Sequence, residues 1–241
     1  MDWIRGASPV GEGGVRESSR GSNCLLLRCA PVRRAQHKGC YRREVVAQEE
    51  AAESAGVAML TVHGRTREQG YTGAAEYDTI AAVKAAVRVP VVANGDIDSP
   101  HKARAVLQAT GADAVMVGRA AQGRPWIFRE INHFLTTGEL LAPPLVAEVR
   151  RALMEHLHDH YSLYGACTGV RSARKHIAWY VRELPGGDAF RSRMLAIDDC
   201  EQQVQAVAVF FDALGAAMDR LPANRLGGPD HMNQALLENA E

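Results

Sequence analysis

Polar residues follow three short apolar runs of the chain. They are His63-Gly64-Arg65-Thr66 after Val57–His63, Asn94-Gly95-Asp96 after Pro90–Ala93, and Gly118-Arg119 after Ala112–Val117. Glycine at Gly95 and Gly118 lets backbone N–H groups approach a phosphate closely, and a following helix N-terminus favours an anion. Because a (β/α)8 barrel builds its active site from loops at the C-terminal ends of its strands, the recurrence predicts a phosphate-ligand site of such a barrel.

Helices and strands are expected to alternate from Glu44 to about Gly138. The three apolar runs are short and continuous, which is typical of strands buried in a parallel sheet. Cap and breaker residues mark the helices between them: Glu44–Ala55 before Gly56, a helix capped by Asp78, a helix between Ser99-Pro100 and Gly111, and Pro125–Leu135. Residues 46–140 are therefore predicted to be α/β, an arc of three βα units rather than a closed barrel.

From Val146 the pattern becomes helical, which predicts a small all-helical domain over residues 146–218. The expected helices are Val146–Tyr164, Gly169–Leu184 and Ala189–Met218, broken at Gly165 and at Pro185-Gly186-Gly187. In the second helix, one face carries the basic residues, Arg171, Arg174, Lys175 and Arg182, and the opposite face is apolar. Spacing alone allows an ordinary solvated face or a nucleic-acid contact. Residues 219–241 are expected to form a loose tail.

Residues 1–45 show no sustained helical or strand period, and only Cys24–Leu27 is apolar. Nine lysines and arginines up to Arg43 stand against three acidic residues. One interpretation is a basic arm that binds RNA. The other is a disordered leader, or a stretch translated from the wrong start or frame.

Composition excludes several classes of protein. The 28 basic and 28 acidic residues give a formal net charge of zero, so any nucleic-acid contact requires a local basic surface. The five cysteines form no CxxC pair, which favours reduced thiols in the cytoplasm over a secreted disulfide scaffold. No window approaches the roughly 18 apolar residues of a membrane helix. We expect a cytoplasmic chain without membrane partners, and a monomer if folded.

Three segments resemble the last three strands of bacterial tRNA-dihydrouridine synthases, closest to the B branch. They are TVHGRTREQGYTGAAEYDTI, VPVVANGDI and GADAVMVGRAAQGRPWIFREI. The resemblance runs from about Glu53 to about Phe211. It implies a partial (β/α)8 TIM barrel, its last three βα units, with FMN as cofactor. It also implies tRNA as the partner, in which the uridine C5–C6 bond is reduced with hydride taken from NADPH through the flavin.

The resemblance assigns roles to particular residues. Asn94, Gly95 and Asp96 match the loop after the seventh strand, Gly118-Arg119 matches the final phosphate-binding loop, and His63 matches the histidine that contacts the isoalloxazine. The segment RSARKHIAWY looks like the tRNA-contacting helix of these enzymes. It would place Arg171, Arg174, Lys175 and His176 against tRNA.

The family's general acid is a cysteine in a Gly-Cys-Pro motif after the fourth strand, and it protonates C5 of the uracil. Gly39-Cys40 imitates this motif, but no apolar strand precedes it. It also lies only 23 positions before His63, whereas one βαβ unit takes about 30 residues. We therefore expect no catalytic cysteine in the chain, and we expect it to be truncated. The family's flavin-contacting lysine on the fifth strand also lacks a counterpart, because no strand is expected before Glu44–Ala55.

Two other functions stay open. A non-catalytic tRNA-binding remnant would use the helical domain and the basic leader. Another FMN or phosphate barrel enzyme, such as a relative of dihydroorotate or dihydropyrimidine dehydrogenase, would share the strand ends. The segment RSARKHIAWY argues against this last function, since those enzymes have no tRNA to hold.

Overall fold

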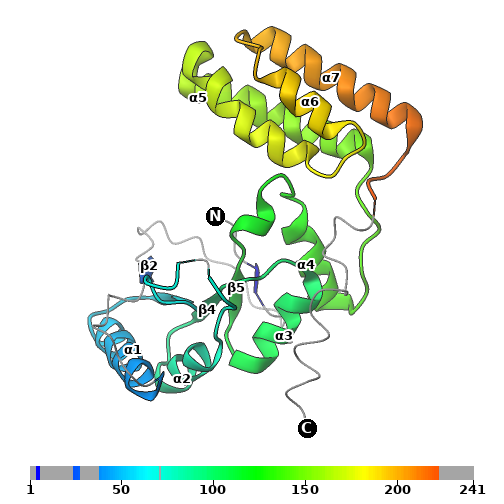
Figure 1. Ribbon diagram of the computed structural model, residues 1–241. Coiled ribbons are helices and arrows are strands. Elements are labelled where there is room, and N and C mark those ends of the chain that lie inside the picture. Colours follow the sequence, from blue (N-terminus) through cyan, green and yellow to red (C-terminus); the bar gives the residue numbers. More distant parts are fainter. Residues whose placement is uncertain (1–3, 6–23, 28–37, 71, 223–241) are drawn as a thin grey trace, which may run out of the picture. The chain divides into compact units, whose positions relative to one another are not determined.

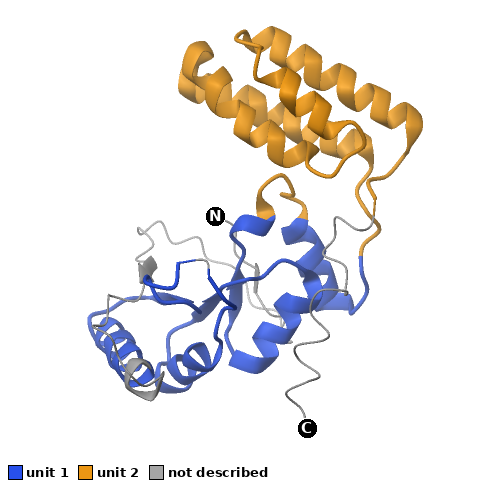
Figure 2. Ribbon diagram, viewed as in Figure 1, with its two compact units in different colours: residues 1–120, 127–140 blue, residues 121–126, 141–241 orange. Residues whose placement is uncertain are grey.

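A computed structural model describes residues 4–5, 24–27, 38–70 and 72–222, with side chains from Arg42 onward. It divides into two compact units, residues 1–120 with 127–140 and residues 121–126 with 141–241 (Figures 1 and 2). The first is an α/β unit and the second is helical. Within the described residues, no helix is long and apolar enough to cross a membrane.

The α/β unit contains one five-stranded sheet in the order β1-β5-β4-β3-β2. Its strands are β1 (Ile4–Arg5), β2 (Cys24–Leu27), β3 (Met59–His63), β4 (Val91–Asn94) and β5 (Ala114–Met116). Strands β2 to β5 run parallel, and β1 pairs antiparallel with β5. Register places His63 beside Asn94 and Asn94 beside Met116, so the carboxyl ends of three strands meet at one edge.

Helices follow the strands in the α/β unit: α1 (Lys38–Ser54), α2 (Asp78–Ala86), α3 (Pro100–Thr110), the 3₁₀ turn η1 (Arg119–Ala121) and α4 (Ile127–Thr137). The boundaries of α3 are those predicted, since Ser99 Oγ accepts a hydrogen bond from the Lys102 N–H and Gly111 has a φ of 66°. Helix α2 differs from the prediction. Its first turn is satisfied by Glu76, whose Oε1 accepts from the Thr79 N–H at 2.7 Å, and not by Asp78.

The segment 1–45, expected to be irregular, contains β1, β2 and the start of α1. Strand β2 precedes α1 and pairs in parallel with β3, so the expectation of no strand before that helix is wrong. Four apolar residues are too few to show a period, and their backbone groups are satisfied by a strand more than 30 residues away. Cys40 lies within α1 and not at the end of a strand.

The helical unit contains α5 (Val146–Val181), α6 (Gly187–Met194) and α7 (Cys200–Ala217). Helix α5 is bent at Gly165, with φ 73° and ψ 167°, where a break was predicted. Its two halves enclose a core with α6 and α7: Leu153, Leu157, Ile177, Phe190 and Phe211. The single helix predicted over Ala189–Met218 is two helices, because Asp199 accepts from the Gln202 N–H at 2.8 Å and starts α7 anew.

Glu49 of α1 gives a pH-dependent prediction. The side chain is 2% exposed, and its Oε2 has no hydrogen-bond partner among the described residues. Burial raises the pKa of Glu49 from 4.5 to about 7. As pH rises, Glu49 ionises in the unfolded chain before it ionises in the folded chain. The stability due to this group is therefore present below pH 4.5 and is lost as pH rises to 7.

Glu49→Gln should therefore stabilise the chain at pH 8 by about 1–2 kcal/mol after allowance for solvent screening, and change little at pH 4. Urea unfolding at both pH values measures this difference. Glu50→Gln is the matched control, because Glu50 is exposed on the same helix. Equal effects of the two substitutions at pH 8 would contradict the prediction.

Candidate functional site

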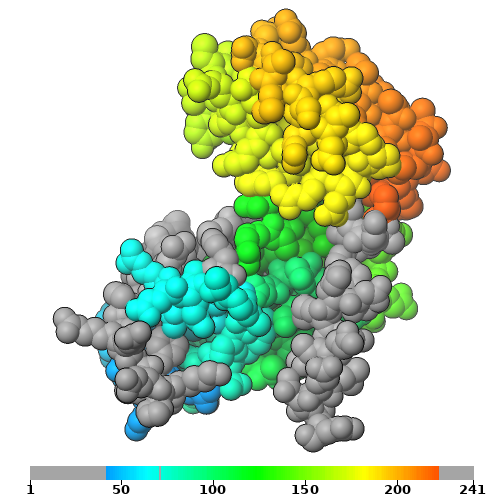
Figure 3. Space-filling view, in the orientation of Figure 1, coloured from blue at the N-terminus to red at the C-terminus, as the bar shows by residue number. Residues whose placement is uncertain are grey.

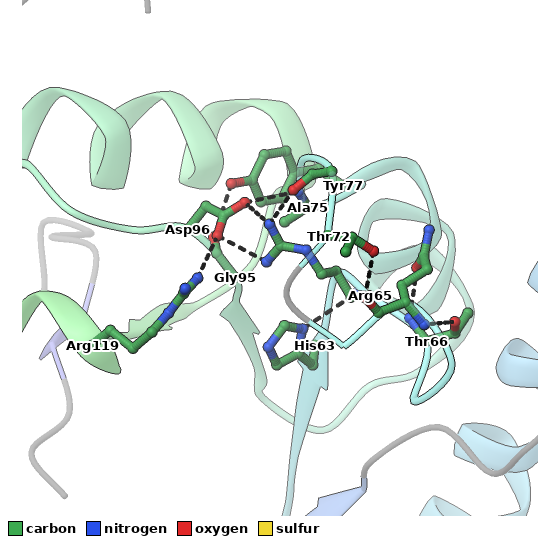
Figure 4. A network of polar contacts seen from close by, with 11 residues as sticks. His63, Arg65, Thr66, Thr72, Ala75, Tyr77, Gly95, Asp96 and Arg119 are labelled. Carbon is green, nitrogen blue, oxygen red and sulfur yellow. Dashed lines mark hydrogen bonds and ion pairs between the residues drawn. The ribbon is translucent and has the colours of Figure 1, made fainter. Parts of the chain in front are cut away.

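Two polar side chains lie at the carboxyl ends of β3 and β4: His63, which Figure 4 shows, and Asn94. Asn94 is tied into the sheet, because its Nδ2 donates to the Met116 carbonyl at 2.7 Å. His63 Nδ1 accepts a hydrogen bond from the Arg65 backbone N–H at 3.1 Å. A neutral imidazole that accepts at Nδ1 carries its proton on Nε2, so His63 can donate a hydrogen bond from Nε2.

Asp96 joins three segments that follow different strands (Figure 4). Its carboxylate accepts from Arg65 Nη1 at 2.8 Å and Nη2 at 2.5 Å, a bidentate pair. Arg65 Nη2 also donates to the Gly73 carbonyl, and the Ala75 N–H donates to Asp96 at 2.9 Å. Arg119 Nη2 reaches the same carboxylate at 3.2 Å. The carboxylate therefore fixes the loop after β3 and the side chain of Arg119.

Burial alone would raise the pKa of the Asp96 carboxyl. Hydrogen bonds from Arg65 and the Ala75 N–H, with the charges of Arg65 and Arg119, hold that pKa below its usual value. The carboxylate is thus ionised at neutral pH. An ionised carboxylate with four donors around it acts as a positioning group for the arginines and does not serve as a proton donor.

The backbone around Asp96 is in an uncommon conformation. Gly95 has a φ of 137° and Asp96 a φ of 47°. A Cβ on Gly95 would lie 2.8 Å from the Ala75 Cβ, and the Tyr77 hydroxyl donates to the Gly95 carbonyl at 2.9 Å. Such backbone persists where its surroundings hold it, and it clusters at ligand sites.

The surface beside Gly118 is open. A Cβ built on Gly118 would meet nothing within 4 Å among the described residues, and the Arg119 side chain is 56% exposed. Arg65, in contrast, is only 4% exposed. The three strand ends thus combine a cation held in place, backbone that a ligand can approach closely, and a histidine donor. Anionic groups such as phosphate fit this set of donors.

The loop between β3 and α2 belongs to the same site. Residues 67–70 are exposed, and the cyan surface in Figure 3 includes this part of the chain. Sequence reasoning noted Arg65 only as part of a strand end and missed Tyr77. The sequence signal for Arg65 was its position two residues after the end of β3. Its partner, Asp96, is 31 residues away along the chain.

The basic residues of the helical unit differ in their surroundings. Arg171 and Lys175 are exposed, and Lys175 Nζ lies 5.3 Å from the centre of the Trp179 ring. Arg174 is used within the unit, since its Nη2 donates to the Ile197 carbonyl at 2.9 Å and to Asp198 at 2.6 Å. His176 lies against His156 and His160, with ring centres 4.8 and 5.1 Å away. The predicted basic face therefore offers three exposed cations, Arg171, Lys175 and Arg182, whereas Arg174 is bound within the unit.

Cysteine chemistry at the strand ends has no support from the described side chains. Cys167 is exposed and Cys200 is half-buried, and both belong to the helical unit. Cys40 lies in α1, where the side chain is outside the described part of the chain.

The family model and the curated relatives that match this chain point to the same family. The family model described as Dihydrouridine synthase (Dus) matches residues 37–215. The chain is 58% identical over 160 residues to tRNA-dihydrouridine synthase B of Pseudomonas putida, covering 66% of this chain and 48% of that protein. It is 52% identical over 179 residues to tRNA-dihydrouridine synthase B of Pectobacterium carotovorum, covering 74% and 54%. The chain thus spans about half the length of these curated relatives.

Among solved structures, wild-type GGGPS from Thermoplasma volcanium matches with a TM-score of 0.32 and 19% identity. The matched region covers 42% of this chain and 40% of the GGGPS chain. A match at this level carries no argument about fold or function.

Proposed function

Because the chain belongs to the dihydrouridine synthase family, we propose that it takes part in reducing uridine to 5,6-dihydrouridine in tRNA, with FMN as flavin and NADPH as reductant. The observation that carries the proposal is the family match over residues 37–215. We further propose that the α/β unit is part of a (β/α)8 barrel. Its four parallel strands, with helices between them, support this architecture.

The strand ends fit a flavin mononucleotide. Arg119 would pair with its phosphate, beside the open backbone at Gly118, and Asp96 would hold the Arg119 guanidinium in place. His63 would donate from Nε2 to the flavin ring, and Asn94, tied to Met116, would shape the site beside it. Bound FMN would supply the hydride that reduces C6 of the uracil.

We assign the proton that must reach C5 to neither Cys167 nor Cys200, because neither residue lies at the end of a strand. Cys40 is a poor candidate, because it lies inside α1 and not at the end of a strand. The residues of this chain are thus assigned to binding and positioning, and none to proton donation.

Flavin binding tests the proposal. The purified chain should bind FMN, seen as quenching of flavin fluorescence on titration. Arg119→Ala should weaken this binding about tenfold, since it removes a charge-assisted hydrogen bond to phosphate. Arg88→Ala is the control, because Arg88 is exposed before β4, at the opposite end of that strand from Asp96. A chain that binds tRNA but no FMN would favour the alternative, a tRNA-binding protein without catalysis.

Salt dependence tests the role of Arg171, Lys175 and their helix in holding tRNA. Replacing both exposed residues with alanine should weaken tRNA binding and lower the slope of log K against log salt by about 1–2, since each cation on a phosphate releases about one counterion. Arg191→Ala on α6, also exposed, should leave the slope unchanged. Arg174→Ala is less informative, because that side chain is bound to Ile197 and Asp198. A slope unchanged in the double variant would remove this surface from the proposal.

A further inference from the structure

Three histidines of the helical unit face one another. His156 and His160 lie one turn apart on the first half of α5, and His176 lies on the second half, beyond the bend at Gly165. One ring nitrogen from each lies within 4.8 Å of the others. His160 is buried, and His156 and His176 are half-buried. The bend in the helix thus brings together imidazoles from two segments that the sequence separates by 16 residues.

We propose that His156, His160 and His176 form a binding site for a divalent transition-metal ion, Zn²⁺ or Co²⁺, with the fourth position open to water. Neutral imidazole is a preferred ligand of these ions, and three histidines with an open position make a known zinc arrangement. This site goes beyond the proposed flavin and tRNA functions and uses no residue of the α/β unit.

The spacing of the nitrogens is close to what a metal requires. At zinc–nitrogen distances of about 2.0–2.1 Å, tetrahedral ligands lie about 3.3 Å apart. Nitrogens within 4.8 Å of one another therefore have to close by about 1.5 Å at most. Rotation of the His156 and His176 rings about their side-chain bonds can cover that distance, since terminal histidine torsions are broad. The helix backbone can stay where it is.

Ser172 orients the ring of His160. The His160 Nε2 lies 2.7 Å from Ser172 Oγ, and that hydroxyl lies 2.8 Å from the Thr168 carbonyl. When Ser172 donates to Thr168, its oxygen accepts from Nε2–H, which leaves the His160 lone pair on Nδ1. Metal-bound histidines almost always donate their other ring N–H in this way, and such partners fix the ring and its tautomer.

Two charged side chains act on the histidines from their own helix segments. Asp159 favours a cation near His156, and Lys175 disfavours one near His160 and His176. The Lys175 ammonium also lies near the face of Trp179, where the ring quadrupole attracts it. A bound ion would link the two halves of α5 across Gly165, and would therefore stabilise the helical unit by mass action.

Cobalt titration of the tag-free, EDTA-treated full chain tests the site. We expect one Co²⁺ per chain, with the visible d–d absorption of a tetrahedral ion, and displacement by one Zn²⁺. His160→Gln and His176→Gln should each lower the Co²⁺ affinity at least about tenfold. Ser172→Ala should lower the affinity by no more than these two substitutions do. His158→Gln is the matched control, because His158 is exposed on the same helix between two of the ligands.

Zn²⁺ should also raise the melting temperature of the wild-type chain and of His158→Gln, and not that of His176→Gln. Absence of saturable Co²⁺ binding, or binding equal in His158→Gln and the two ligand variants, would overturn the proposal. If a variant loses helical circular dichroism, His156→Gln replaces it, and unchanged affinity in that variant would overturn the site equally. Because no flavin or tRNA enters these measurements, their result is independent of the proposed enzymatic role.

Discussion

Replacing Asp96 with alanine is expected to lower the free energy of unfolding by about 2–3 kcal/mol, because the buried Arg65 guanidinium would lose the half-buried carboxylate that pairs with it. Arg65, with a 4% exposed side chain, would lose both of its hydrogen bonds to the carboxylate. The Ala75 N–H and Arg119 would lose the same acceptor. The substitution therefore removes the acceptor of four hydrogen bonds at once.

Urea unfolding of the full chain at neutral pH measures this loss. Glu68→Ala, which removes an exposed carboxylate from the neighbouring loop, should change stability by less than about 0.5 kcal/mol. The pKa of Asp96 is lowered by folding, so its contribution is present above the unfolded pKa of about 3.8 and is lost as pH falls through the folded value. The difference between wild type and Asp96→Ala should therefore shrink in strong acid. A difference that stays constant with pH would mean that the carboxylate charge is not what holds Arg65.

Local signals predicted the parts of the fold that depend on local chemistry. Ser99, Pro100 and Gly111 bound α3 where they were expected to, because a side-chain cap, a fixed proline φ and a left-handed glycine act within one turn. The apolar runs marked β3, β4 and β5 to within about two residues at each end. The alternation of strand and helix followed from these boundaries.

Features that depend on distant partners were missed or misplaced. Strand β2 exists through its pairing with β3, and no pattern within Cys24–Leu27 shows that pairing. Asp96 was selected as a ligand residue, but its role as the anchor of Arg65 follows from a contact across 31 residues. The histidine cluster requires the turn direction at Gly165, which the sequence marks only as a break. Pairing across a fold is set by tertiary packing, so single-sequence patterns do not contain it.

The candidate site likewise has features that local sequence predicts and features that depend on packing. Gly95 and Gly118 could be selected because only glycine allows the backbone conformation or the close approach that such loops use. The exposed and the packed arginines of RSARKHIAWY, in contrast, share one spacing. Arg174 differs from Arg171 and Lys175 only because it donates hydrogen bonds to Ile197 and Asp198. Helical spacing predicts which residues share a face, and packing decides which of them stay available for a partner.

Gly123→Ala is expected to destabilise the helical unit by about 3–5 kcal/mol, the sum of backbone strain and overpacking. Gly123 has a φ of 73°, in the left-handed region. An ideal Cβ there would lie 2.7 Å from the Tyr180 backbone nitrogen and closer still to the Trp179 carbonyl. Helix backbone cannot move aside as a flexible side chain can, so either the 121–126 turn or the second half of α5 has to shift. Thermal unfolding followed by helical circular dichroism measures the loss.

Gly186→Ala separates the two causes. Gly186 lies in the same unit with a φ of 74°, but a Cβ there would meet only the Phe210 ring at 3.8 Å, an ordinary contact. Its substitution should therefore cost only the left-handed strain, about 1–2 kcal/mol. The excess loss in Gly123→Ala then measures how tightly the 121–126 turn is held against the helix that carries Lys175 and His176. Equal losses in the two variants would mean that the turn moves away freely, and that α5 keeps its position without it.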